Sequence, residues 1–155
     1  MISLSLFIPG RPRQKGNHKA FCPKCRAPAI ITENWSNDAG KKLKQWVETI
    51  VVFTSGNWPF DPLELPVSVD CIFYFEKPKT NKDPFPSNRR IPDGDKLMRA
   101  VGDALAVGKR RSKFLSGVVI DDDCRIVDLS VKKRWCDNVH PYEGMQISVE
   151  VMSEQ

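Results

Sequence analysis

The chain has no long hydrophobic stretch. Its apolar runs, such as residues 50–53, extend over only a few positions of a 155-residue sequence. A membrane-spanning helix needs about 20 consecutive apolar residues, so we expect no membrane partner. The N-terminus also lacks the basic start and apolar core of a secretion signal. We therefore expect a cytoplasmic protein.

The five cysteines and two histidines predict neither a disulfide framework nor an obvious complete zinc site. The five cysteines are an odd number without a secretory context, which argues against disulfides. Cys22 and Cys25 form a C-x-x-C pair typical of zinc knuckles, and His18 offers a third ligand. Structural zinc takes four ligands, so another cysteine or a second copy would have to complete the site. A zinc knuckle within the basic loop at residues 11–35 is one hypothesis, and a loop without metal is the other.

The chain also lacks repeats and low-complexity tracts. With 41% hydrophobic and 28% charged residues, it has an ordinary globular composition and can bury a core of its own. We predict one domain over residues 1–155.

Hydrophobic periodicity predicts an α+β fold in the order β-α-β-α-β-β-β, with one mixed β-sheet and two helices packed on it. Alternating or short buried runs predict the strands, and apolar residues at helical spacing predict the helices. The predicted elements are strands at 2–9, 67–75, 117–120, 125–135 and 144–152, a helix at 37–53, and a second helix of about ten residues closed by Gly108. The apolar stripe of this second helix consists of Leu97, Met98, Val101, Ala104 and Leu105. In the strand at 125–135, we expect Val127, Leu129 and Val131 to face the core.

Acidic residues are missing from the first 32 positions, which carry six cations. The net charge is +5, and further basic groups follow in the middle and near the end of the chain. Such clusters suit phosphate contacts, although a solvated basic surface is the alternative. The candidate DNA-binding residues are Arg11, Arg13, Lys15, Lys19, Arg89, Arg90, Lys109, Arg110, Arg111, Lys113, Lys132 and Lys133.

Two acidic groups interrupt this basic sequence. Asp93 and Asp95 precede an apolar helical stripe, and Asp122 and Asp123 follow the predicted strand at 117–120. Carboxylates from different elements are the oxygen ligands that Mg²⁺ takes in phosphodiester hydrolysis. Taken alone, Asp-Gly-Asp is more often a turn and helix cap, and a run of aspartates is more often a solvated turn. Spacing therefore leaves both readings open.

Asp103 stands one helical turn after Arg99. The two side chains could simply pair at this i, i+4 spacing.

The stretch PDGDKLMRAVGDAL, a basic connection, and then VIDDDCRIVDLSVKK resemble the motif of the RusA-type Holliday junction resolvases. In that family an acidic pair opens a helix that continues to D-A-L, and a strand-end acidic pair leads into a V-V-type strand. The matching residues are Asp93, Asp95, Asp103, Ala104, Leu105, Asp122, Asp123 and Val127. The resemblance is specific over residues 92–135 and looser on either side.

The resemblance implies a homodimeric, Mg²⁺-dependent endonuclease, with Mn²⁺ able to substitute, that resolves four-way DNA junctions by paired incisions in recombination and repair. It assigns metal binding and catalysis to Asp93, Asp95 and Asp123, with Asp122 as a further candidate ligand. The family's catalytic lysine is replaced by Arg99 and its asparagine by Lys96. Arginine keeps the charge but cannot donate a proton, so Lys96 and Arg99 are the candidate cations. A bacterial or phage-infected host is also implied.

Two alternatives stay open at this point. One is a non-catalytic zinc-knuckle protein that binds nucleic acid through its basic N-terminal loop. The other is a metal nuclease that acts on other branched or on single-stranded DNA.

Overall fold

The computed structural model describes residues 2–16, 19–20, 31–32, 38–108 and 116–152. Within these ranges no helix is both long and apolar enough to cross a membrane. The elements are, in chain order, β1 (Ser3–Pro9), β2 (Lys19–Ala20), β3 (Ile31–Thr32), α1 (Asp38–Asn57), β4 (Val67–Phe75), α2 (Gly94–Leu105), the short 3-10 turn η1 (Asp123–Arg125), β5 (Ile126–Trp135) and β6 (Gly144–Val151).

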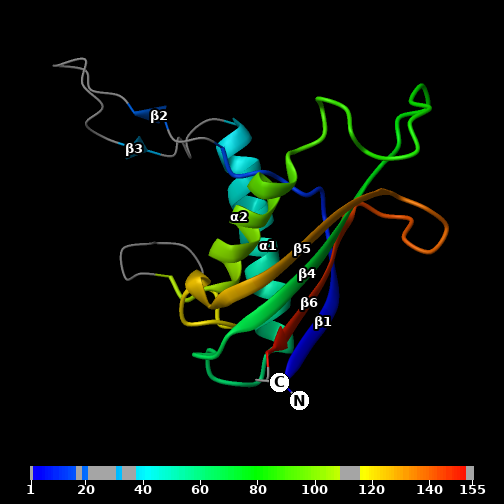
Figure 1. Cartoon of the computed structure of the whole chain (residues 1–155). Coiled ribbons are helices and arrows are strands. Elements are labelled where there is room, and N and C mark those ends of the chain that lie inside the picture. Colours follow the sequence, from blue (N-terminus) through cyan, green and yellow to red (C-terminus); the bar gives the residue numbers. More distant parts are fainter. Residues whose placement is uncertain (1, 17–18, 21–30, 33–37, 109–115, 153–155) are drawn as a thin grey trace, which may run out of the picture.

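Four strands form one mixed sheet in the order β1-β6-β4-β5. β6 pairs antiparallel with both β1 and β4, whereas β4 and β5 are parallel neighbours. α1 and α2 pack against each other on one face of this sheet (Figure 1). The predicted α+β fold with two helices on a mixed sheet is confirmed. β2 and β3 form a separate two-stranded ladder inside the segment predicted to be a loop.

The alternation predicted for β4 is present in the structure. Its apolar face is buried under the helices and consists of Val67, Val69, Cys71, Phe73 and Phe75. On the opposite face Tyr74 is also buried, because the His140 ring stacks on it with centroids 4.3 Å apart. β4 is therefore covered on both faces near its end, as suits a central strand.

The two helices present the predicted apolar stripes to the sheet. In α1 the buried side chains include Leu43, Trp46, Ile50 and Val51, and the helix continues to Asn57. α2 buries the predicted stripe of Leu97, Met98, Val101, Ala104 and Leu105. This helix ends at Leu105 instead of continuing toward Gly108, because Val107 N donates to Ile120 O at 2.9 Å and the backbone leaves the helical path.

The predicted strand at 117–120 is wrong as a strand. Ile120 makes isolated parallel bridges to Leu63 and Ala106, but no ladder forms. Val119 and Ile120 are fully buried, so the apolar run does belong to the core. Gly117 lies so close to the end of α2 that an added Cβ would meet the carbonyl oxygen of Ala106 at 2.4 Å. Close packing on the helix end replaces regular strand pairing here.

The expected inward orientation in β5 needs correction. Val127 is 60% exposed because it is the extra residue of a bulge: Ile126 pairs with Val67, and Asp128 already pairs with Ser68. Leu129 is on the helix side of the sheet but is 49% exposed, since it faces an open groove beside α2. Val131 faces the same groove and is half-buried. Alternation predicted the side of the sheet correctly for two of the three residues but not their burial.

Several predicted site residues lie outside the described residues or have side chains that the structure does not describe. The zinc candidates His18, Cys22 and Cys25 are outside them, as are the basic residues Lys109, Arg110, Arg111 and Lys113. Lys19 belongs to β2, but its side chain is not described. The zinc hypothesis and this part of the DNA-binding set stay predictions.

Candidate active site

A groove of about 790 Å³ runs between α2 and β5. Apolar side chains line part of it, from Met98 on α2 and from Ile126, Leu129 and Val131 on β5. Its charged lining residues are Lys15, Asp95, Arg99, Asp103, Asp123 and Lys133. We call this hollow the acidic groove because three carboxylates face it.

One face of α2 supplies half of the charged residues that line the groove. Asp95, Arg99 and Asp103 follow one another at intervals of four residues, which places them in a row along the helix. Arg99 Nη2 lies 3.6 Å from Asp95 Oδ2, so Arg99 pairs with the earlier carboxylate. Asp103 is paired with another residue, Lys15, whose Nζ lies 2.6 Å from Asp103 Oδ2. The local pair between Arg99 and Asp103 that the spacing suggested is thus replaced by a contact that is distant in sequence.

The aspartate run after Ile120 divides into different roles. Arg125 donates two hydrogen bonds to the Asp121 carboxylate, at 2.7 and 2.8 Å, and these lower the pKa of Asp121. Asp122 caps the η1 turn by accepting from Cys124 N at 3.0 Å. Asp123 is the member of the run that lines the acidic groove. The solvated-turn reading therefore describes Asp121 and Asp122 better than Asp123.

Asp123 lies beside the last turns of α2. A Cβ added to Gly102 would be 3.8 Å from the Asp123 Cβ. Partial burial, a hydrogen bond with Asp122, and the negative charges of Asp122 and Asp103 together raise the pKa of Asp123. Within the described part of the chain, no salt bridge to Asp123 occurs. Among the described residues, this carboxylate thus has acidic neighbours and no salt bridge to balance them.

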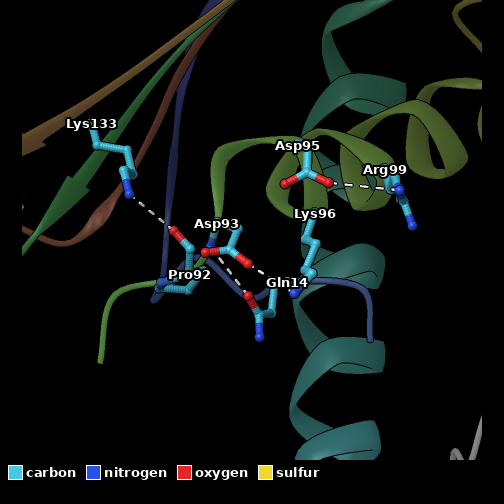
Figure 2. A network of polar contacts seen from close by, with 7 residues as sticks. All are labelled: Gln14, Pro92, Asp93, Asp95, Lys96, Arg99 and Lys133. Atoms are coloured by element: carbon cyan, nitrogen blue, oxygen red, sulfur yellow. Dashed lines mark hydrogen bonds and ion pairs between the residues drawn. The ribbon is translucent and has the colours of Figure 1, made fainter. Parts of the chain in front are cut away.

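Asp93 lies at the first end of α2 and is not among the residues that line the acidic groove. It occupies the N-cap position without a side-chain cap bond, and its Oδ2 is 2.8 Å from Lys96 Nζ. The hydrogen bond and charge of Lys96 lower the pKa of Asp93. Figure 2 shows this pair directed toward Gln14, whereas Asp95 and Arg99 pair further along the helix. Lys96 and Asp93 therefore lie together outside the groove lining.

A second hollow of about 330 Å³ adjoins Asp93. We call it the arginine cleft because Arg11, Arg13, Arg89 and Arg90 line it. Arg11 is 3.9 Å from Glu143, and the other three arginines form no salt bridge within the described residues. Four guanidinium groups around one concavity suit phosphate oxygens.

The basic group near the end of β5 separates onto two faces. Lys133 lines the acidic groove, and its Nζ donates to Pro92 O at 3.2 Å. Lys132 is exposed on the opposite face, since neighbouring side chains of a strand point to opposite sides. The cluster that looks continuous in sequence therefore reaches only partly into the groove.

The acidic groove fits a divalent cation in the kind of ligand it offers. Mg²⁺ takes oxygen ligands, keeps several waters, and often binds only one or two protein carboxylates. Asp103 and Asp123 are close enough for their charges to interact, and Asp123 has no cation partner among the described residues. Asp95 lies seven residues before Gly102, about 10 Å along the helix axis. In the described residues, no group of three or more His, Cys, Asp or Glu side chains is preassembled for a metal.

The comparison with protein families gives a match along most of the chain. The family model described as Endodeoxyribonuclease RusA matches residues 9–150. The chain belongs to the RusA endodeoxyribonuclease family. The match includes both faces of the acidic groove and the arginine cleft, which all lie within residues 11–133. RusA nucleases act on branched DNA and generally depend on a divalent metal. The comparison with curated proteins found no match.

The RusA resemblance predicts Asp95, Asp123 and Arg99 as site residues, and the structure brings these three to one groove. The resemblance gives Asp103 no site role, although its spacing from Asp95 and Arg99 is a signal that it shares their helix face. Lys15 was assigned to DNA binding alone. No local pattern could have revealed that it contacts Asp103.

Proposed function

We propose that this RusA-family chain is a Mg²⁺-dependent endonuclease that resolves four-way DNA junctions in recombination and repair. The observation that carries the proposal is the acidic groove. Its lining includes the carboxylates of Asp95 and Asp103 from α2 and of Asp123 from η1, together with the cations Arg99, Lys15 and Lys133. Acids that attract a metal and cations that attract phosphate are both needed for phosphodiester hydrolysis.

Asp93, Asp95 and Asp123 are the proposed metal-binding carboxylates, with Asp122 next to them. Asp95 and Asp123 already line the groove. The Asp93 side chain is 62% exposed, so it is free to leave Lys96 and turn toward an ion. When bound, a divalent cation neutralises phosphate charge and lowers the pKa of a water.

The proposed reaction is hydrolysis of one phosphodiester bond in each strand that is cut. The water oxygen bonds to phosphorus in line with the leaving O3′, and the P–O3′ bond breaks. One water proton is released to solvent, and O3′ takes up a proton, which leaves 5′-phosphate and 3′-hydroxyl ends. Arg99 lines the groove and is positioned to stabilise the charge that develops on the phosphate. Lys96 would first have to separate from Asp93 to do so.

The arginine cleft is the proposed holding site for the DNA backbone. It lies next to Asp93, at the same turn that begins α2, so a strand bound there leads directly to the carboxylates. Phosphate contacts of this kind fix the position of a nucleic acid without reading its sequence.

Paired incisions require two active sites, and we propose that two copies of the chain supply them about a two-fold axis. Light scattering of the purified protein, alone and with a junction, would measure the mass of the assembly. A monomeric mass in both conditions would contradict this part of the proposal.

The deciding experiment is cleavage of a synthetic four-way junction with Mg²⁺ or Mn²⁺. We expect the wild-type chain to cut the junction, and Asp93→Asn to bind it without cutting. Asp128→Asn serves as a matched control, because Asp128 is on β5 but on the sheet face away from the groove. A wild-type protein that binds the junction and never cuts it would refute the enzyme and leave a binding protein. Equal cutting of junction, fork and linear duplex would refute junction specificity only.

A further inference from the structure

Lys15 reaches the acidic groove from a distant part of the chain. The other groove-lining residues all belong to positions 94–133, whereas Lys15 follows β1. Its Nζ lies 2.6 Å from Asp103 Oδ2, and the lysine side chain is only 21% exposed. The ammonium group is thus part of the carboxylate site.

The backbone around Lys15 is held against the beginning of α2. Lys15 N donates to Lys96 O at 3.1 Å, and the neighbouring Gln14 side chain accepts from Asp93 N at 3.2 Å. Figure 2 shows Gln14 directly beside Asp93. At the other end of this segment, Gly10 N donates to Glu143 O at 3.0 Å. These bonds fix the main chain, so the four-carbon stem of Lys15 is the part that is able to move.

The distribution of charge explains why movement would matter. Asp95 has Arg99 as its cation and Asp103 has Lys15, but Asp123 has acidic neighbours and no salt bridge within the described residues. A divalent ion is therefore attracted first to Asp123. Asp103 lines the groove with Asp123 and its charge acts on Asp123, so it can join the same ion, and Asp103 is the carboxylate that Lys15 holds. An ion that shares Asp103 must compete with the ammonium group for the same oxygens.

We propose that Lys15 competes with the metal for Asp103 and then takes part in the reaction. Its ammonium group binds Asp103 when the site holds no metal. When a metal binds Asp103, the ammonium group is displaced and binds the scissile phosphate. This inference rests on the proposed function. It makes Asp103 a metal ligand and gives Lys15 the phosphate-binding role for which Lys96 is badly placed, since Lys96 pairs with Asp93 outside the groove.

Two variants of the full chain separate the charge of Lys15 from its stem. Lys15→Met keeps the length and apolar stem but removes the charge, and Lys15→Arg keeps the charge. Lys42→Met is the control, because Lys42 is in an exposed salt bridge with Asp38 on α1. Thermal melting of each variant checks that it is folded.

The first measurement is the affinity for Mn²⁺ in the absence of DNA. Titrations are monitored through the electron paramagnetic resonance signal of free Mn²⁺. Because the competing ammonium is gone, we expect Lys15→Met to bind Mn²⁺ roughly two- to fivefold more tightly than wild type. Lys15→Arg and Lys42→Met should match wild type within about twofold. Asp103→Asn should bind Mn²⁺ more weakly. Equal or weaker binding by a folded Lys15→Met would overturn the proposal, since a structural lysine would not compete with metal.

The second measurement is junction cleavage at saturating Mn²⁺. We expect the kcat of Lys15→Met to fall roughly 10²-fold, with KM nearly unchanged and activity partly retained in Lys15→Arg. A normal kcat for Lys15→Met would overturn the phosphate role. Failure of wild type to cut would refute the proposed nuclease instead. The Mn²⁺ affinities of wild type and Lys15→Met would still decide whether Lys15 competes with the metal.

Discussion

The acidic groove and the arginine cleft adjoin the same turn at the start of α2, but they differ in how far their charged side chains are paired. In the groove, Asp95 and Asp103 each have a cation within 3.6 Å. In the cleft, three of the four arginines have no acidic partner within the described residues. A site with carboxylates and cations side by side can hold a metal and a phosphate together, whereas a site with mainly unpaired arginines attracts the phosphates of a DNA backbone. The difference suggests that chemistry and DNA affinity are carried by separate surfaces.

The largest expected effect comes from removing a groove carboxylate. Asp123→Asn should lower the kcat for junction cleavage roughly 10²- to 10³-fold, because the amide replaces the carboxylate that attracts the metal. DNA affinity in the absence of metal should stay unchanged. Single-turnover cleavage and an electrophoretic shift assay measure the two effects, with Asp128→Asn as control. A parallel loss of binding would show that the two surfaces are not separate.

A smaller effect should follow from removing one cation of the cleft. Arg13→Ala should weaken junction binding roughly threefold and reduce the slope of log affinity against log salt by about 0.9, the value for one phosphate contact. The kcat at saturating DNA should be that of wild type. Fluorescence anisotropy at several salt concentrations measures the slope, and Lys42→Ala is the control. A lower kcat with an unchanged slope would place Arg13 in the chemistry.

The smallest effect should distinguish two neighbouring lysines of β5. Lys133→Ala removes a groove cation that donates to Pro92 O, so cleavage should fall roughly two- to threefold. Lys132 lies on the other face of the sheet, and Lys132→Ala should leave kcat within about twofold of wild type. Both variants are assayed on the same junction at saturating metal. Equal losses would mean that the outer face of β5 also contacts DNA near the cut.

Local pattern was enough to predict much of this molecule. The alternation in β4 and the apolar stripe of α2 each follow from residues near one another in sequence, so both elements could be found before the structure. The acidic pairs could also be recognised, because the RusA resemblance covers them. The alternation of apolar residues was less informative for Leu129. It indicates which face of the sheet Leu129 is on, but not whether a helix covers that side chain.

The contact between Lys15 and Asp103 could not be predicted for a different reason. It joins residues 88 positions apart, and its partner choice depends on how the segment after β1 meets α2. The direction of Asp93 is a similar case: its position in the chain is compatible with either side of the helix start, and the salt bridge to Lys96 selects one.

The position of β6 in the sheet has a consequence for how the protein is made. β1 is joined to the sheet only through β6 among the described strands, since the order is β1-β6-β4-β5. During synthesis β1 leaves the ribosome early, yet its only ladder partner there emerges more than 130 residues later. The crossover from β4 to β5 carries all three groove acids and can form before that. A nascent chain would therefore bring its groove acids together before β1 is held in the sheet, and the strand that precedes Lys15 would gain its ladder partner only after β6 has been made.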